Sequence, residues 1–164
     1  MPNQYNYNFS EETQSYHFTT KDDIEYKVAF IIDHTFSTVS NLEIDNVYQL
    51  IIEKVSDKIE KFDANVSETI KDIVSSFFNN ELNSMIYICD DEDGKSELRF
   101  NVFDRWYQTS SIKDIVTKVN NVIKCTNNGI DTVIYSSLMY HNDNVNKEVI
   151  IEIYQTIQEI LNEK

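Results

Sequence analysis

The sequence predicts an α+β fold in which an antiparallel sheet, beginning with an N-terminal β-meander, is packed by two to three helices. Apolar residues in the first third of the chain recur at every second position, as in half-buried strands. Later segments place them three and four residues apart, as in amphipathic helices. Only two glycines and one proline occur among 164 residues, so few sharp turns are expected, and residues 1–164 are expected to form a single domain.

Four strands are expected in the N-terminal third. The clearest one covers residues 24–32, where apolar side chains share one face at alternate positions. Shorter runs with the same period precede it at 5–9 and 16–18, and a run rich in β-branched residues follows it at 47–55. Because the connections between successive runs are short, we expect an antiparallel meander with the other face partly open to water.

A first helix is expected over residues 66–78, where apolar residues follow helical spacing. Asn65 is the expected N-cap, with Glu68 completing a capping box, and Asp63 is the competing cap. A short apolar strand at 85–89 comes next, and its composition predicts that it is buried.

After an acidic turn, a second helix is expected over about 96–107. Residues 112–125 fit either a helix or the first strand of a hairpin with residues 130–140, and we favour the hairpin. Asn144 is the expected cap of a last helix, whose apolar stripe ends at Leu161.

Acidic residues dominate the charge: 28 Asp and Glu against 14 Lys and Arg, a net charge of −14. Direct nucleic-acid binding is excluded on this ground, since it requires a cationic surface, and so is binding to anionic membranes. The first six residues lack the features of a secretory leader, and no apolar run could span a bilayer. Cys89 and Cys125 suggest neither a disulfide framework nor a metal knuckle. We therefore expect a cytoplasmic protein with no cofactor, whose partner is another protein.

The acidic turn is the densest candidate for a metal site. Asp90, Asp91 and Asp93 follow the buried strand, and divalent cations prefer converging oxygen ligands. The EF-hand pattern fails, however, because Phe100 stands where a bidentate glutamate is needed if Gly94 is the loop glycine. A solvated turn is the favoured interpretation, and a metal-dependent phosphoryl-transfer or nuclease-like enzyme is the alternative.

The other chemically active residues are assigned structural roles. Cys89 is interpreted as a small buried side chain, because the carboxylates that follow it disfavour a nucleophilic thiolate. The three histidines, His17, His34 and His141, share no metal-ligand spacing. Structural or solvated roles are therefore favoured for all three.

Arg99 falls in the middle of the apolar arc of the second helix. An unpaired guanidinium on such a face costs several kcal/mol, so we expect a salt bridge to the acidic turn, with Asp90 or Asp91 nearest. The alternative is that Arg99 lines a cleft and holds an anion.

On the last helix, acidic residues follow one side: Glu148, Glu152, Glu159 and Glu163. Such carboxylates could imitate phosphates, which makes an inhibitor that mimics nucleic acid a further alternative.

Several segments together resemble a family of small bacterial proteins that is known only as a domain of unknown function. The segments are 86–90, 93–94, Arg99, 103–107, 135–138 and the helix start at Asn144. The family often has proline after that asparagine, where this chain has Val145. The resemblance implies a bacterial cytoplasmic protein and no particular activity. Its motif marks these residues as a candidate interaction or structural site: Cys89, Asp90, Asp93, Arg99, Asp104, Arg105 and Trp106.

The leading functional prediction is a non-enzymatic protein-interaction or regulatory module. Its ten tyrosines and its excess of carboxylates suit a basic or aromatic partner surface. No catalytic residue is assigned.

Overall fold

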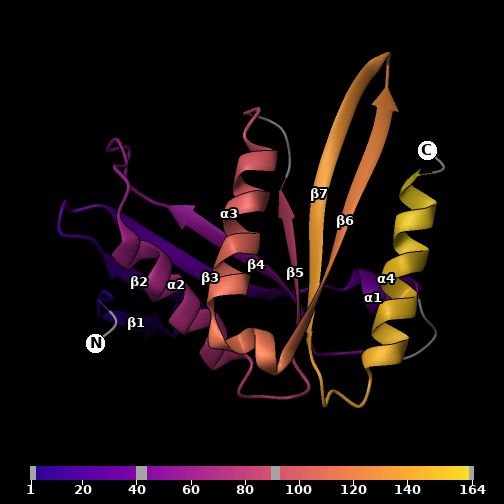
Figure 1. Cartoon of the computed structure of the whole chain (residues 1–164), viewed down its shortest axis with the longest axis horizontal. Coiled ribbons are helices and arrows are strands. Elements are labelled where there is room, and N and C mark those ends of the chain that lie inside the picture. The colour runs from indigo at the N-terminus through magenta and orange to yellow at the C-terminus, as the bar shows by residue number, and fades with distance from the viewer. Residues whose placement is uncertain (1–2, 40–43, 90–92, 163–164) are drawn as a thin grey trace.

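The computed structural model describes residues 3–39, 44–89 and 93–162 of the chain. These residues form a seven-stranded sheet with the strand order β1-β2-β3-β4-β5-β7-β6 (Figure 1). The strands are β1 (Tyr7–Ser10), β2 (Ser15–Thr19), β3 (Glu25–Ile32), β4 (Val47–Lys54), β5 (Ser84–Cys89), β6 (Val116–Asn127) and β7 (Ile130–His141). The helices are α1 (Thr35–Val39), α2 (Ala64–Phe77), α3 (Ser96–Thr109) and α4 (Lys147–Asn162), with a short 3₁₀ helix, η1 (Ser111–Asp114), after α3.

The predicted α+β fold and its N-terminal meander are confirmed. Strands β1 to β4 pair antiparallel in chain order, and β5, β7 and β6 continue the sheet antiparallel to one another. The junction between the two halves is the exception, because β4 and β5 pair parallel, with Val47 opposite Ser84. Helix α2 lies between these two strands in the chain and carries the backbone back across the sheet, as parallel neighbours require.

Helices pack on both faces of this sheet. Alternate residues along a strand point to opposite faces, so Met85 and Ile86 of β5 belong to different cores. Met85 packs in the core beneath α2 and α3, and Ile86 in the core beneath α1 and α4. In Figure 1, α2 and α3 lie in front of the sheet, whereas α4 lies beside β6, on the side of the β6–β7 hairpin away from α3. The predicted partial opening of the second face applies to β1–β3, whose outward side chains include the exposed Asn8 and the half-buried Lys27.

Local capping signals decide where several elements begin. The N-cap of α2 is Asp63, the competing cap, because its carboxylate accepts a hydrogen bond from the backbone N–H of Asn65. The prediction of Asn65 as the cap is therefore wrong. Asn144 does accept a hydrogen bond from the N–H of Asn146, but α4 begins three residues after Asn144, at Lys147. The short helix α1 was not predicted.

The hairpin favoured for the C-terminal half is confirmed as β6 and β7. Its two-residue turn consists of Asn128 and Gly129, which have φ angles of 53° and 77°. Two consecutive positive φ angles match the twist of a tight hairpin, and asparagine and glycine tolerate them best. The first residues of the ambiguous segment, 112–114, belong to η1 rather than to a strand. Among the described residues, no helix has both the length and the apolar character needed to cross a membrane.

Candidate functional site

Several of the predicted site residues gather where α3 packs on β5, β7 and β6. Cys89 is the last residue of β5 and is buried, as predicted, while Arg99 and Asp104 come from α3. The strand register places Tyr87 of β5 opposite Ser137 of β7, and Ser137 opposite Asn120 of β6. One row of polar side chains therefore crosses this end of the sheet.

Lys118 of β6 is the centre of this arrangement, and sequence reasoning missed it. Only 2% of its side chain is exposed, and its Nζ donates a hydrogen bond of 2.9 Å to Oδ1 of Asp104. A second hydrogen bond goes to Asn120, whose Oδ1 also accepts one of 2.9 Å from Ser137. The ammonium lies 5.1 Å from the centroid of the Phe100 ring. We call Lys118, Asp104, Asn120 and Ser137 the Lys118 network.

The electrostatics of the network follow from burial and pairing. The hydrogen bond from Lys118 lowers the pKa of the Asp104 carboxyl below its ordinary value. For Lys118, burial lowers the pKa, and this effect outweighs the opposite effect of Asp104. A lysine with a lowered pKa can act in catalysis, but this ammonium is already engaged by a carboxylate, an amide and an aromatic ring. The network therefore serves to hold α3 on the sheet.

Arg99 forms its salt bridge with Asp93. The predicted salt bridge between Arg99 and the acidic turn is confirmed. The partners predicted for it, Asp90 and Asp91, lie outside the described residues. The part of the apolar arc around Arg99 is exposed: 43% of the Arg99 side chain and 62% of the neighbouring Leu98 are accessible to solvent. The guanidinium stabilises the charged carboxylate and so lowers the pKa of Asp93.

Arg105 and Trp106 do not join this cluster. Arg105 is exposed on α3, and Trp106 turns toward α2, where it borders a small apolar cavity together with Ile70 and Phe103. The cavity volume is about 20 Å³, which is enough for a single water molecule and for no larger ligand. Trp106 therefore belongs to the packing between the two helices.

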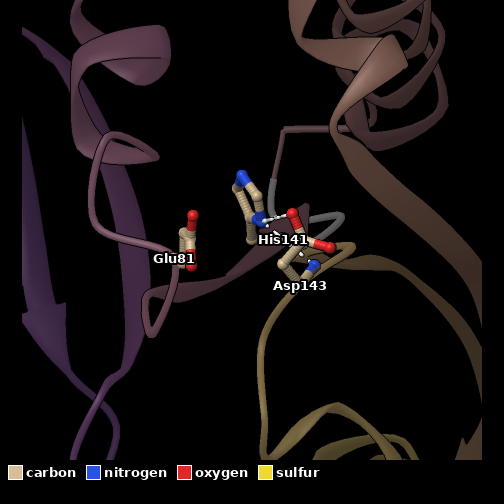
Figure 2. A group of neighbouring side chains, drawn as sticks. All are labelled: Glu81, His141 and Asp143. Atoms are coloured by element: carbon tan, nitrogen blue, oxygen red, sulfur yellow. Dashed lines mark hydrogen bonds and ion pairs between the residues drawn. The ribbon is translucent and has the colours of Figure 1, made fainter.

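A second group of chemically active side chains lies at the opposite end of β5, and the sequence did not reveal it. Glu81 from the α2–β5 loop, His141 from the end of β7 and Asp143 from the β7–α4 loop come together there (Figure 2). One possible ligand atom from each residue lies within 4.8 Å of the other two. His141 and Asp143 are close in sequence and could have indicated part of this group. Glu81 could not, because it is sixty residues away from His141.

The imidazole of His141 is buried, whereas the two carboxylate residues are exposed. Nδ1 of His141 accepts a hydrogen bond of 3.1 Å from the backbone N–H of Asp143 and lies 3.9 Å from Oδ2 of the same residue (Figure 2). We call these three residues the Glu81–His141–Asp143 group. The structural or solvated role expected for His141 fits its burial, but the group also has the composition of a metal site.

Asn144 ties together the two loops that carry this group. Its side chain is 1% exposed, and Nδ2 donates hydrogen bonds to the carbonyl of Leu82 at 3.1 Å and to Oγ of Ser84 at 3.2 Å. Because Leu82 follows Glu81 and Asn144 follows Asp143, this clamp holds the backbone of the two loops that carry the carboxylates together.

Comparison with known proteins gives one match. A family model described as "Family of unknown function (DUF6169)" matches residues 62–156, a range that includes every residue of both groups. No curated protein matches the chain, and no solved structure matches it.

Proposed function

This chain belongs to the family of unknown function DUF6169, and we propose that it is a non-enzymatic, cytoplasmic interaction or regulatory module that binds a basic partner protein. The observation that carries the proposal is a pair of apolar side chains in the loop between β4 and α2. Phe62 is 97% exposed and Ile59 is 91% exposed. Figure 1 shows this loop projecting at one end of the sheet.

Such exposure is costly unless a partner covers it. A large apolar side chain that is fully buried at an interface contributes roughly 1.5–3 kcal/mol, and aromatic anchors dominate binding energy at many interfaces. Isolated surface apolar residues are common, but here two of them lie three residues apart and both are almost fully exposed. The pair is therefore a candidate anchor that would enter a pocket of the partner.

The charge of the whole chain supports a basic partner. The loop itself is mixed in charge, because Lys58 and Lys61 alternate with Asp57 and Glu60. The whole chain has a net charge of −14, which attracts cationic surfaces over long distances and repels anionic ones. Charge would accelerate the encounter, and the apolar pair would supply most of the affinity.

The two alternatives have weaker support. A metal-dependent phosphoryl-transfer enzyme would use the turn from Asp90 to Asp93, but the Asp93 carboxylate is already bound to Arg99. Mimicry of nucleic acid would use the exposed carboxylates of α4, among them Glu148 and Glu152, and it is a narrower form of the same interaction hypothesis. Both alternatives remain predictions.

The test compares the full chain with an Ile59→Ser/Phe62→Ser double variant as bait in lysates of the native cell. The matched control is Ile130→Ser, which removes another exposed isoleucine, at the base of the β6–β7 hairpin turn. We expect the wild type and the control to retain a basic protein. The amount of that protein should fall at least tenfold with the double variant. Titration calorimetry with that purified protein should then show weaker binding as salt increases. Equal retention by all three baits, or salt-independent binding, would refute the proposal.

A further inference from the structure

We propose that Glu81, His141 and Asp143 form a binding site for a divalent transition-metal ion, with Zn²⁺ as the ion to test. The site is independent of the exposed loop at residues 55–63, so either proposal can fail without the other.

The donor set selects the class of ion. One imidazole nitrogen and two carboxylate oxygens are ligands that zinc and its neighbours in the first transition row accept. Calcium and magnesium prefer ligand sets made only of oxygen, so a buried histidine in the group argues against them. Three protein ligands leave at least one position of a tetrahedral zinc for water.

The distances fit after small side-chain movements. Zinc ligands at about 2.0–2.2 Å from the ion lie roughly 3.5 Å from one another in a tetrahedral site. Here the candidate ligand atoms all lie within 4.8 Å of one another, and Nδ1 of His141 is 3.9 Å from Oδ2 of Asp143. Glu81 and Asp143 are exposed, so rotation about their side-chain bonds can close the remaining gap without disturbing the core. Figure 2 shows their carboxylates on either side of the His141 ring.

Nδ1 is the ring nitrogen of His141 that faces Asp143. Because Nδ1 accepts the backbone N–H of Asp143, this nitrogen carries a lone pair rather than a proton. An ion bound at Nδ1 would replace that 3.1 Å hydrogen bond. Burial in the fold already restricts the ring, so binding of the ion costs little additional conformational entropy in this side chain.

The backbone that carries the ligands is also held in place. Asn144 bonds the α2–β5 loop through Leu82, and its own Oδ1 accepts the N–H of Asn146 in the β7–α4 loop. The two loops therefore form one unit, although Glu81 is distant in sequence from the other two ligands. Asn144 is a positioning residue in this proposal and does not touch the ion.

The experiment titrates Zn²⁺ into the full chain by isothermal calorimetry, with Glu81→Gln and Asp143→Asn as separate variants. Both substitutions keep the size of exposed side chains, so the fold should persist, whereas replacing the buried His141 could unfold the chain. Glu148→Gln removes an exposed carboxylate from the nearby start of α4 and serves as the matched control. Cys125→Ser tests whether zinc binds a thiol instead.

We expect one saturable zinc site in the wild type, with affinity at least tenfold weaker in Glu81→Gln and in Asp143→Asn. Glu148→Gln and Cys125→Ser should bind like the wild type, and Ca²⁺ and Mg²⁺ should bind more weakly than Zn²⁺. Absence of saturable binding would overturn the proposal. Wild-type affinity in both ligand variants, or loss of the site in Cys125→Ser, would also overturn it. As a second measurement, Co²⁺ should produce visible absorption bands in the wild type that are lost in Asp143→Asn.

Discussion

Nζ of Lys118 lies 2.9 Å from Oδ1 of Asp104, and this salt bridge joins the edge strand β6 to helix α3. The two side chains differ in exposure, at 2% for the lysine and 38% for the aspartate. Water can therefore reach the carboxylate but hardly the ammonium, so the lysine depends on its protein partners.

This asymmetry predicts unequal effects of removing each partner. Asp104→Ala leaves a buried ammonium without its carboxylate and should lower the free energy of unfolding by about 2 kcal/mol. Lys118→Met replaces the charge with an apolar chain of similar length and should cost less. Urea unfolding of both variants measures the difference. A larger loss in Lys118→Met would show that the ion pair itself, rather than the avoidance of an unpaired buried charge, stabilises the fold.

The same pair predicts a contribution to acid sensitivity. The pKa of Asp104 is lower in the folded protein than in the unfolded chain, so its contribution to stability is present above about pH 4 and is lost as the pH falls through the folded pKa. In Asp104→Asn this contribution is absent at every pH. Urea unfolding from neutral to acid pH should therefore show a shallower loss of stability in Asp104→Asn than in the wild type. If stability fell equally with pH in the two proteins, Asp104 would not be a source of the acid sensitivity.

Tyr7 should contribute to alkaline sensitivity. Its hydroxyl donates a hydrogen bond of 2.7 Å to Asp72 of α2, and its pKa is raised, first by burial and then by this carboxylate acceptor. A raised pKa in the folded state means that the contribution is complete below about pH 10 and is lost as the pH rises further. Tyr7→Phe should therefore cost about 1 kcal/mol at neutral pH, and the difference from the wild type should shrink at about pH 11. Urea unfolding of both proteins at the two pH values measures this difference in free energy. A difference that does not change with pH would exclude this role for Tyr7.

Asn144 should be a determinant of stability whether or not a metal binds. Asn144→Ala removes two hydrogen bonds donated by a buried amide and one that it accepts, and should lower the free energy of unfolding by about 2 kcal/mol. Asn146 is exposed and uses its backbone in this interaction, so Asn146→Ala should change stability by less than about 0.5 kcal/mol. Thermal or urea unfolding compares the two. Equal effects would mean that the clamp between the loops contributes little.

Local patterns in the sequence were enough to predict most of the secondary structure. The alternation from Ile24 to Ile32 predicted β3, and the asparagine-glycine turn predicted the β6–β7 hairpin, because both signals lie within a few residues. The parallel pairing of β4 with β5 could not be predicted in this way. Strand direction depends on where α2 returns the chain, and apolar periodicity is the same for parallel and antiparallel strands.

The candidate sites were predicted only in part. Cys89 was correctly expected to be buried, and Arg99 to pair with the acidic turn. Lys118 was missed because its position in an alternating strand does not reveal whether its ammonium meets water or a carboxylate from α3. Its burial results from the strand register, which places it opposite Met139 on the face that α3 covers.

By itself, the sequence determined the fold class, the order of most elements and the acidic character of the surface, since periodicity and composition are local properties of a chain. The tertiary structure alone decided which charges are buried and which reactive groups meet. Glu81 and His141 are sixty residues apart and become neighbours only because β5 and β7 pair along their length, with Ser84 opposite Tyr140. Contacts of that kind depend on strand pairing and loop closure, which no short stretch of sequence encodes.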